Sequence, residues 1–309
     1  MKYLALGNTL NADINSATAR AAGIGLPYAG FTGSVSQALR PYPQFSDIRN
    51  LYEPIGWSTY QAMQMRLQKR YSSGVNFLAA YTLSKSLVSG GGYTGLGDDA
   101  AGSRPLDTAN RKIEKRLAGF DTPQNLVLSW GYELPFGKGK RFFSSAGRAA
   151  NLIAGGWQVN AIQRYVRGTP IGVGGGGVIP LSNGGNRPNV VLGGSPRTNV
   201  SRGDFDPARD RYLDISAFSQ PAPFTIGNAP PVLPNVRTFA LFNEDFSVLK
   251  DFRIYEAHRI QFRAEFFDIF NRVVFGAPGT NINAPATFGK IGGQANSPRN
   301  IQLGLKYVF

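Results

Sequence analysis

The sequence contains no cysteine and a single histidine, His258. The lack of cysteine excludes disulfide bonds, thiolate nucleophiles and cysteine-based metal sites. One histidine cannot build a histidine-rich metal centre, and it has no cysteine nucleophile to activate. Because His258 lies in a short turn beside Arg259, we interpret it as a solvated turn residue.

Charge and long apolar runs are also scarce. Charged residues make up 17% of the chain, against about 25% in an average protein. No run approaches the roughly 18 apolar residues of a membrane helix, and the mean hydropathy of -0.19 excludes a membrane helix bundle. The net charge of +14 raises the possibility of nucleic-acid binding. We expect no nucleic-acid partner, because the cations are spread along the chain and the densest group (Lys138, Lys140 and Arg141) lies in a predicted turn. Contacts with anionic lipid and lipopolysaccharide explain these charges more simply.

The chain ends in an alternating segment of apolar and polar residues. Ile301, Leu303 and Leu305 fall at every second position, so a strand would place them on one face. This pattern is typical of the closing strand of a bacterial outer-membrane barrel, and equally of an edge strand in a soluble sandwich. Four residues also match the C-terminal signal that is read by the barrel-assembly machinery, namely Gln302, Gly304, Tyr307 and Phe309.

Six further segments have the period of a strand. They are residues 57–71, 75–85, 122–136, 156–167, 243–254 and 259–271. The clearest alternation predicts a lipid-facing row of Leu126, Leu128, Trp130, Tyr132 and Leu134, to be joined by Ile301, Leu303 and Leu305. On the polar face of the segment 259–271, Arg263 and Glu265 are expected to form a charge pair in the lumen wall, with a substrate contact as the alternative.

The lengths of the connections favour a barrel over a sandwich. Counted back from the C-terminus, long connections alternate with shorter ones, and the longest covers residues 168–237 with no strong period. Outer-membrane barrels have long extracellular loops and short periplasmic turns, which places the C-terminus in the periplasm. This topology also predicts two aromatic bands. The periplasmic band would contain Tyr71, Phe77, Phe136, Trp157 and Phe309, and the outer band Tyr165 and Phe270.

We therefore predict an all-β fold, an antiparallel transmembrane β-barrel with long extracellular loops. Residues 1–56 are expected to form an extracellular loop region, and residues 57–309 to supply about seven C-terminal strands. Bacterial barrels usually have an even number of strands, and the N-terminus has no signal peptide. Both observations lead us to expect an incomplete barrel, the C-terminal part of a longer protein, with no plug domain present.

Four stretches resemble a known family. They are Ala29–Gln44, Tyr60–Tyr71, Tyr132–Arg141 and Phe262–Asn271. They are similar to TonB-dependent outer-membrane transporters of the Oar-like, acidobacterial type, and the similarity follows nearly the whole chain in order. The resemblance implies a 22-stranded barrel with an N-terminal plug, of which this chain would be the last third. It also implies transport driven through a TonB box, so the TonB complex would act only through N-terminal regions missing here.

No residues assemble into an active site, and we expect neither enzyme activity nor a cofactor. Asp204, Asp206 and Asp210 lack the glycine and the ligand spacing of a calcium loop. Asp98 and Asp99 are interpreted as solvated loop residues. Glycines 174–177 precede no helix and no Lys-Ser/Thr, so they predict a flexible loop and not a phosphate cradle.

The expected function is therefore the barrel part of an outer-membrane transporter for an unidentified ligand, such as a siderophore or a glycan. One alternative is a self-contained small porin or adhesin-like barrel. The other is a soluble all-β binding protein, which the row from Leu126 to Leu134 disfavours because it would expose a large apolar surface.

Overall fold

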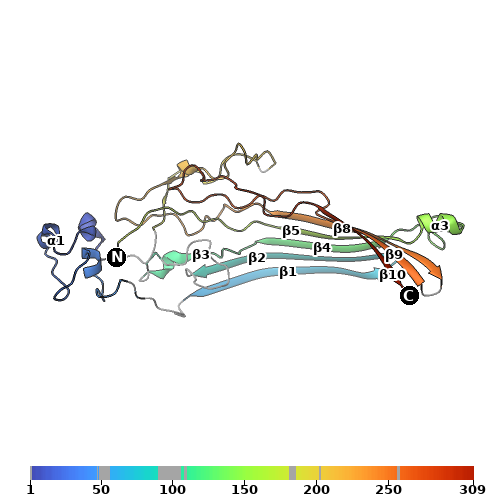
Figure 1. Ribbon diagram of the computed structural model, residues 1–309, viewed down its shortest axis with the longest axis horizontal. Coiled ribbons are helices and arrows are strands. Elements are labelled where there is room, and N and C mark those ends of the chain that lie inside the picture. The colour runs from blue at the N-terminus through green and yellow to red at the C-terminus, as the bar shows by residue number, and fades with distance from the viewer. Residues whose placement is uncertain are drawn as a thin grey trace.

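The protein is built around one antiparallel sheet, shown in Figure 1. The computed structural model describes residues 2–46, 48, 56–89, 106–107, 110–180, 186–201, 203–255 and 258–309. Seven long strands follow one another in the order β1-β2-β4-β5-β8-β9-β10, and the short strand β3 pairs with β2. The all-β, antiparallel fold and the seven strands predicted from the sequence are confirmed.

The long strands have the following bounds: β1 Trp57–Ser72, β2 Val75–Ser89, β4 Gln124–Glu133, β5 Trp157–Val166, β8 Leu241–Tyr255, β9 His258–Phe267 and β10 Asn300–Val308. The short elements are η1 Leu4–Asn11, α1 Ala17–Ala21, α2 Val35–Ala38, η2 Arg111–Glu114, β3 Lys115–Leu117, α3 Arg148–Ala154, β6 Asn189–Val190, η3 Ile215–Ala217 and β7 Phe218–Ser219. The long strands contain between 9 residues in β10 and 16 in β1, and about 9–11 suffice for a tilted strand to cross a bilayer.

The strand boundaries differ from the prediction where turn chemistry outweighs alternation. Strand β9 stops at Phe267 because Asp268 and Asn271 adopt positive φ and turn the chain. The β1–β2 connection is a two-residue hairpin in which Ser73 and Gly74 both have positive φ (55° and 78°). This is the backbone pattern of a type I′ turn, whose twist matches that of the flanking strands.

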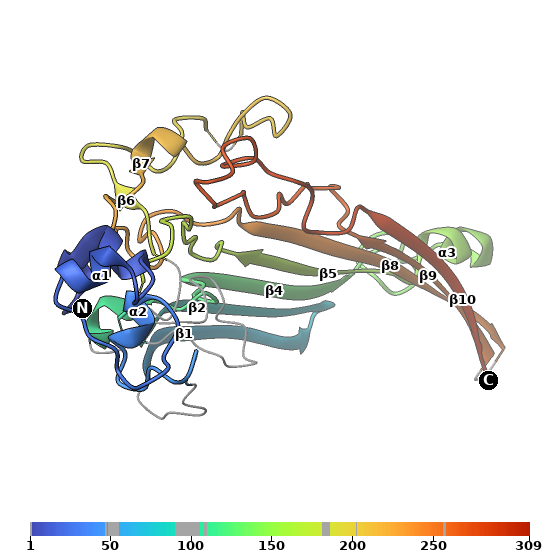
Figure 2. The ribbon, with the colours of Figure 1, turned by 60° about the vertical axis from the view of Figure 1, so that its left-hand side comes forward.

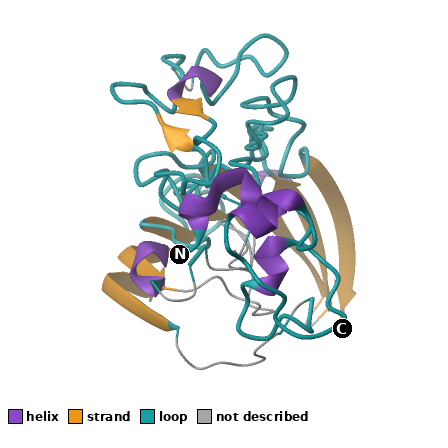
Figure 3. Ribbon diagram, turned by 90° about the vertical axis from the view of Figure 1, so that its left-hand side faces the viewer, coloured by secondary structure: helices purple, strands orange, loops and turns teal. Residues whose placement is uncertain are grey.

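The sheet is curved and open. Figure 2 shows the strands bending along their length, and Figure 3 shows the arc from one end. Among the described residues, β1 pairs only with β2 and β10 pairs only with β9. The wall is therefore not closed, which agrees with the expectation of an incomplete barrel.

Longer and shorter connections lie at opposite ends of the sheet. We call the end at which β2, β5 and β9 finish the loop end, and the other the turn end. The N-terminal helices lie at the loop end, whereas α3 and the C-terminus lie at the turn end (Figure 1). The helix α3 was not predicted, because its seven residues lie in a connection rich in glycine and basic residues.

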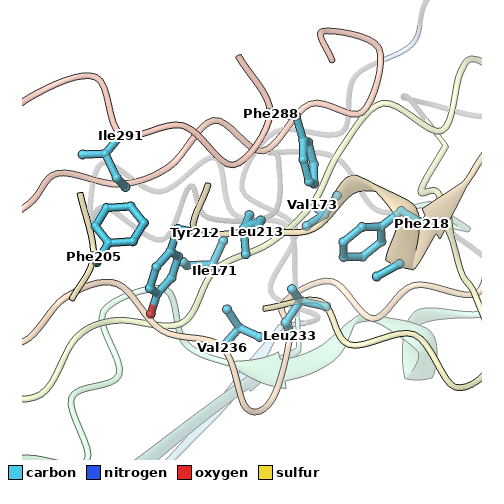
Figure 4. Packing of buried hydrophobic residues seen from close by; sticks show 11 residues of the cluster. Ile171, Val173, Phe205, Tyr212, Leu213, Phe218, Leu233, Val236, Phe288 and Ile291 are labelled. Atoms are coloured by element: carbon cyan, nitrogen blue, oxygen red, sulfur yellow. The ribbon is translucent and has the colours of Figure 1, made fainter. Parts of the chain in front are cut away.

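The connections of the loop end pack together around a hydrophobic core, which we call the loop cluster (Figure 4). Its buried residues come from residues 167–240 and 268–299: Ile171, Val173, Phe205, Tyr212, Leu213, Ala217, Phe218, Leu233, Val236, Phe288 and Ile291. Residues 168–237 thus have no strong period and yet contribute to a packed core. Periodicity could not reveal it, because the core is made from irregular backbone that pairs across two connections.

The glycines 174–177 belong to this packed structure, so the prediction of a flexible loop at this position is wrong. The N–H of Gly174 donates to the carbonyl of Thr280, and its own carbonyl accepts from Ile282. A side chain on Gly176 would meet the backbone of Arg187 at 2.1 Å. Gly176 thus permits a close approach of two backbones.

The N-terminal residues form a small helical unit with its own core. Ser16 and Ser34 cap α1 and α2 by accepting hydrogen bonds from the backbone N–H three residues on, a standard stabilisation of helix N-termini. The buried residues are Leu10, Ile14, Ala19, Phe31 and Val35. Phe224 of the loop cluster packs against them, so the unit is joined to the rest of the loop end.

Candidate functional site

The register of the sheet places apolar side chains from every long strand on one face, which we call the apolar face. Directly opposed residues in an antiparallel pair point to the same side. One row runs without a break across six strands, through Phe77, Trp130, Ala161, Phe246, Phe266 and Ile301. The apolar pattern recognised strand by strand in the sequence is therefore one continuous surface.

Much of this apolar face is exposed, most of all on the edge strands. Leu67, Leu303 and Leu305 are 66%, 72% and 76% exposed, and Leu83 in β2 and Phe242 in β8 are 41% and 47% exposed. Soluble monomers rarely expose a contiguous apolar surface of more than a few hundred Å². An apolar surface of this extent is typical of a sheet that contacts lipid.

The residues predicted to face lipid lie on or beside this surface. Leu126, Leu128, Trp130 and Tyr132 are on the apolar face of β4, and Ile301, Leu303 and Leu305 are on that of β10. Leu134 lies just beyond β4, where its N–H donates to the carbonyl of Trp157 at 2.9 Å.

Two charged residues of the apolar face, Glu244 and Lys250, are each only 2% exposed. Glu244 accepts from Arg272 at 3.0 Å. The ammonium of Lys250 donates to the carbonyls of Ile153 and Gly155 at 2.8 and 2.7 Å. Each charge is therefore satisfied, as a buried charge must be.

The opposite face of the sheet is polar, and we call it the polar face. Arg263 and Glu265 lie two residues apart on it with Nη1 and Oε1 at 3.5 Å, and Gly304 and Gln302 stand opposite them in β10. Both side chains are partly exposed, so the pair contributes little to stability.

Gly131 makes room for polar groups on this face. A Cβ there would approach the amide oxygens of Asn76 and Asn160 at 2.4 and 2.6 Å. Ile162, which is 55% exposed, is an apolar exception on the polar face.

Of the residues predicted to form the barrel-assembly signal, Gln302, Gly304 and Tyr307 lie in β10, and Phe309 follows the strand. Tyr307 is on the apolar face, where its hydroxyl is 2.7 Å from Nδ1 of His258, and its ring also lies 5.8 Å from that of Phe309. His258 is the first residue of β9 and its ring stacks on Tyr307. The interpretation of His258 as a solvated turn residue is therefore wrong, because the strand extends one residue further than its alternation indicated.

Two buried ion pairs fasten the loop end. Arg237 binds the carboxylate of Asp121 at 2.6 Å, and Arg187 binds that of Glu114 at 2.6 Å. Each pair joins the β2–β4 connection to the loop cluster. Burial lowers the pKa of Arg187, and the charge of Glu114 opposes that effect. Sequence analysis missed both pairs because their partners are far apart along the chain.

A recess of about 440 Å³ lies where strands β4 and β5 meet the loop cluster. Three arginines line it, namely Arg167, Arg197 and Arg237. The guanidinium of Arg197 lies 5.3 Å from the ring centre of Tyr212. The residues that line this recess also come from segments far apart in the sequence.

The acidic residues considered for metal binding do not converge. Ser201 bonds to Asp204, and Arg209 bonds to Asp210 and lowers its pKa. In the described part of the chain, no three His, Cys, Asp or Glu side chains are grouped to hold a metal ion. Asp98 and Asp99 lie outside the described residues. No helix in the described ranges has the length and apolar character needed to span a membrane.

Membrane-crossing strands, one exposed apolar face and one polar face together define the wall of an outer-membrane β-barrel. The family model described as outer membrane beta barrel domain matches residues 6–302, so the chain belongs to that family. Its location is accordingly the outer membrane. No curated protein and no solved structure matches the chain.

Proposed function

We propose that this chain is the C-terminal barrel part of a TonB-dependent outer-membrane transporter of the Oar-like subgroup, which takes up a ligand such as a siderophore or a glycan. The observation that carries the proposal is the open sheet. Strands β1 and β10 each have one described neighbour, so each presents a free edge, and further strands would pair with both. A barrel enlarged in this way has room for a transport lumen.

In this proposal the apolar face meets lipid and the polar face lines the lumen. The loop end is extracellular, and the turn end, with the C-terminus, is periplasmic. The segregation of long and short connections supports this orientation. Gln302, Gly304, Tyr307 and Phe309 are assigned as the signal that the barrel-assembly machinery recognises.

The chain itself performs no catalysis in this proposal. Its loop cluster forms part of the outer surface that an incoming ligand meets first, with the recess at Arg167 and Arg237 open to anionic groups. Energy from the TonB complex reaches the transporter through regions that the present chain does not contain. Lipopolysaccharide contacts the wall near the loop end.

The test is uptake by cells that express the complete reading frame containing this chain. Labelled ferric hydroxamate siderophore and labelled maltooligosaccharide serve as probes, in cells with and without TonB. Uptake that needs both TonB and an intact β10 supports the proposal. Uptake that persists without TonB contradicts it.

A conductance measurement separates the small-porin alternative. The 309-residue chain is reconstituted alone in planar lipid bilayers. The proposal predicts no stable unitary conductance, because an open sheet encloses no pore. Steady, uniform channels from this chain alone would favour a self-contained porin.

A further inference from the structure

The connection between β4 and β5 contains a structured surface that the barrel wall does not explain. We call residues 137–155 the basic strap. Its first turn is closed by a parallel bridge, in which the N–H of Gly137 donates to the carbonyl of Phe142 and the N–H of Phe142 donates to the carbonyl of Pro135. The amide oxygen of Asn151 in α3 accepts from the N–H of Lys138 at 2.6 Å. The strap is therefore a folded element in which the helix and the turn are fixed to each other.

The strap is fastened to the apolar face of the sheet. Lys250, on that face of β8, donates to the carbonyls of Ile153 and Gly155 at the C-terminal end of α3. The indole N–H of Trp157 donates to the carbonyl of Ile153 at 2.9 Å. A cation at a helix C-terminus is favourable, and here it also fixes the helix beside the surface that contacts lipid.

The strap exposes apolar side chains next to that surface. Phe143, Leu152 and Ile153 are 63%, 54% and 75% exposed. Ile153 adjoins that surface through the hydrogen bond from Trp157, and the ring of Phe143 lies 6.2 Å from that of Phe136, just beyond the end of β4. The shared boundary makes lipid the natural occupant of this surface.

The charge of the strap selects the kind of lipid. Residues 137–155 contain four basic residues and no Asp or Glu, the basic ones being Lys138, Lys140, Arg141 and Arg148. All four are exposed. Within the part of the chain that the structure describes, only Lys140 of these four has an acidic partner, Glu133 at 3.0 Å. Exposed apolar residues bordered by unpaired cations suit a membrane surface that carries negative headgroups.

We propose that the basic strap is a binding site for anionic glycerophospholipid. Phe143, Leu152 and Ile153 enter the acyl region at the turn end of the wall, and Lys138, Arg141 and Arg148 contact the phosphate groups. The choice of leaflet rests on the proposed function. Because the turn end is periplasmic in that proposal, the lipid is a phospholipid of the inner leaflet. Lys250 positions the helix through its C-terminal carbonyls.

The first experiment measures whether the strap enters lipid. The chain has no cysteine, so a single Cys can be labelled without background. Ile153→Cys, Leu303→Cys and Val178→Cys are each labelled with an NBD fluorophore. The full chain is reconstituted in phosphatidylcholine vesicles containing phosphatidylglycerol, by detergent removal. Quenching by lipid-borne nitroxide then reports contact with acyl chains.

The expected result is quenching at positions 153 and 303 and none at position 178, which lies at the loop end and is 83% exposed. Quenching at 303 without quenching at 153 overturns the strap inference and leaves the barrel wall standing. Quenching at 153 without quenching at 303 supports the strap and contradicts the lipid-facing wall. Absence of quenching at both positions overturns both proposals.

The second experiment tests the preference for anionic lipid. Trp57→Phe and Trp130→Phe leave Trp157 as the only tryptophan, directly beside the strap. Its fluorescence is quenched with brominated phosphatidylglycerol or brominated phosphatidylcholine. We expect brominated phosphatidylglycerol to quench Trp157 more strongly than brominated phosphatidylcholine does. The affinity for phosphatidylglycerol relative to phosphatidylcholine should fall on the order of fivefold for each strap cation that is removed, in the variants K138Q, R141Q and R148Q.

A matched control removes the same charge at the other end of the molecule. Arg20→Gln, Arg209→Gln and Lys290→Gln change three exposed cations of the loop end. This control is expected to retain the lipid preference at Trp157. Equal quenching by the two lipids in the unmodified strap, or equal losses in the strap and control variants, would overturn the assignment of an anionic-lipid site.

Discussion

Arg237 and Asp121 lie 116 positions apart in the sequence, yet their guanidinium and carboxylate groups are joined at 2.6 Å. The side chain of Asp121 is 1% exposed, and its other oxygen accepts from the N–H of Ser86 in β2. Arg237 also donates to the carbonyl of Gly168. This pair therefore ties the end of β2 to the loop cluster.

Breaking this pair should loosen the loop end. Asp121→Asn leaves the guanidinium of Arg237 largely buried without a counter-charge, which destabilises a structure by about 3–5 kcal/mol. We expect faster hydrogen exchange and faster proteolysis within residues 167–240, with β4 and β5 unchanged. Arg209→Gln is the control, since its ion pair with Asp210 is on the surface and the Arg209 side chain is 70% exposed. If residues 167–240 were protected from hydrogen exchange equally well in the Asp121 variant and in the unmodified chain, a fastening role would be contradicted.

The core of the loop cluster should depend on Phe288, which is fully buried against Phe218. Phe288→Ala leaves a cavity and is expected to destabilise the cluster by about 3–5 kcal/mol. Limited proteolysis of the chain in detergent would show cleavage in residues 168–240 at lower protease concentration. Leu192→Ala, at a fully exposed site, should leave the cleavage pattern unchanged.

Gly227 should tolerate no side chain. A Cβ there would lie 1.8 Å from the carbonyl oxygen of Arg187, so Gly227→Ala must displace backbone and disturb the nearby pair of Arg187 with Glu114. Hydrogen exchange of the loop cluster is expected to rise. Gly292→Ala is the matched control, because its Cβ has no neighbour within 4 Å. Similar exchange in the two variants would contradict the packed structure.

The two faces of the sheet should respond differently to charge. Leu128→Arg places a cation on the apolar face and is expected to destabilise insertion into vesicles by about 2–4 kcal/mol if it lies near the bilayer centre. Ser129→Arg, one residue on, points to the polar face and should have a much smaller effect. The measurement is the fraction of the chain that stays inserted in vesicles as the urea concentration is raised. Equal sensitivity at the two positions would contradict the assignment of the faces.

The terminal aromatic residue is predicted to serve assembly. Phe309→Ala should lower the amount of folded protein in the outer membrane, because Phe309 fills the last position of the proposed assembly signal. Lys306→Ala, on the polar face of β10, is the control. Heat-dependent gel mobility of outer-membrane fractions gives the folded fraction, and an unchanged fraction in the Phe309 variant would refute the role.

Much of the wall could be predicted from the sequence because a strand repeats every two residues. Leu126, Leu128, Trp130 and Tyr132 show their common face without reference to any other strand, and connection length then separates the two ends. Boundaries such as Phe267 were harder to predict, because they depend on single residues with positive φ.

The sequence by itself thus determined the strands, their apolar face and the absence of cysteine chemistry. Only the tertiary structure decided that irregular connections form a core around Phe288, that Asp121 meets Arg237, and that Lys250 fastens α3 to the apolar face. The physical reason is the range of the interactions. Alternation is a local property of the backbone, whereas buried ion pairs and a core of irregular segments join residues whose separation in sequence carries no periodic signal.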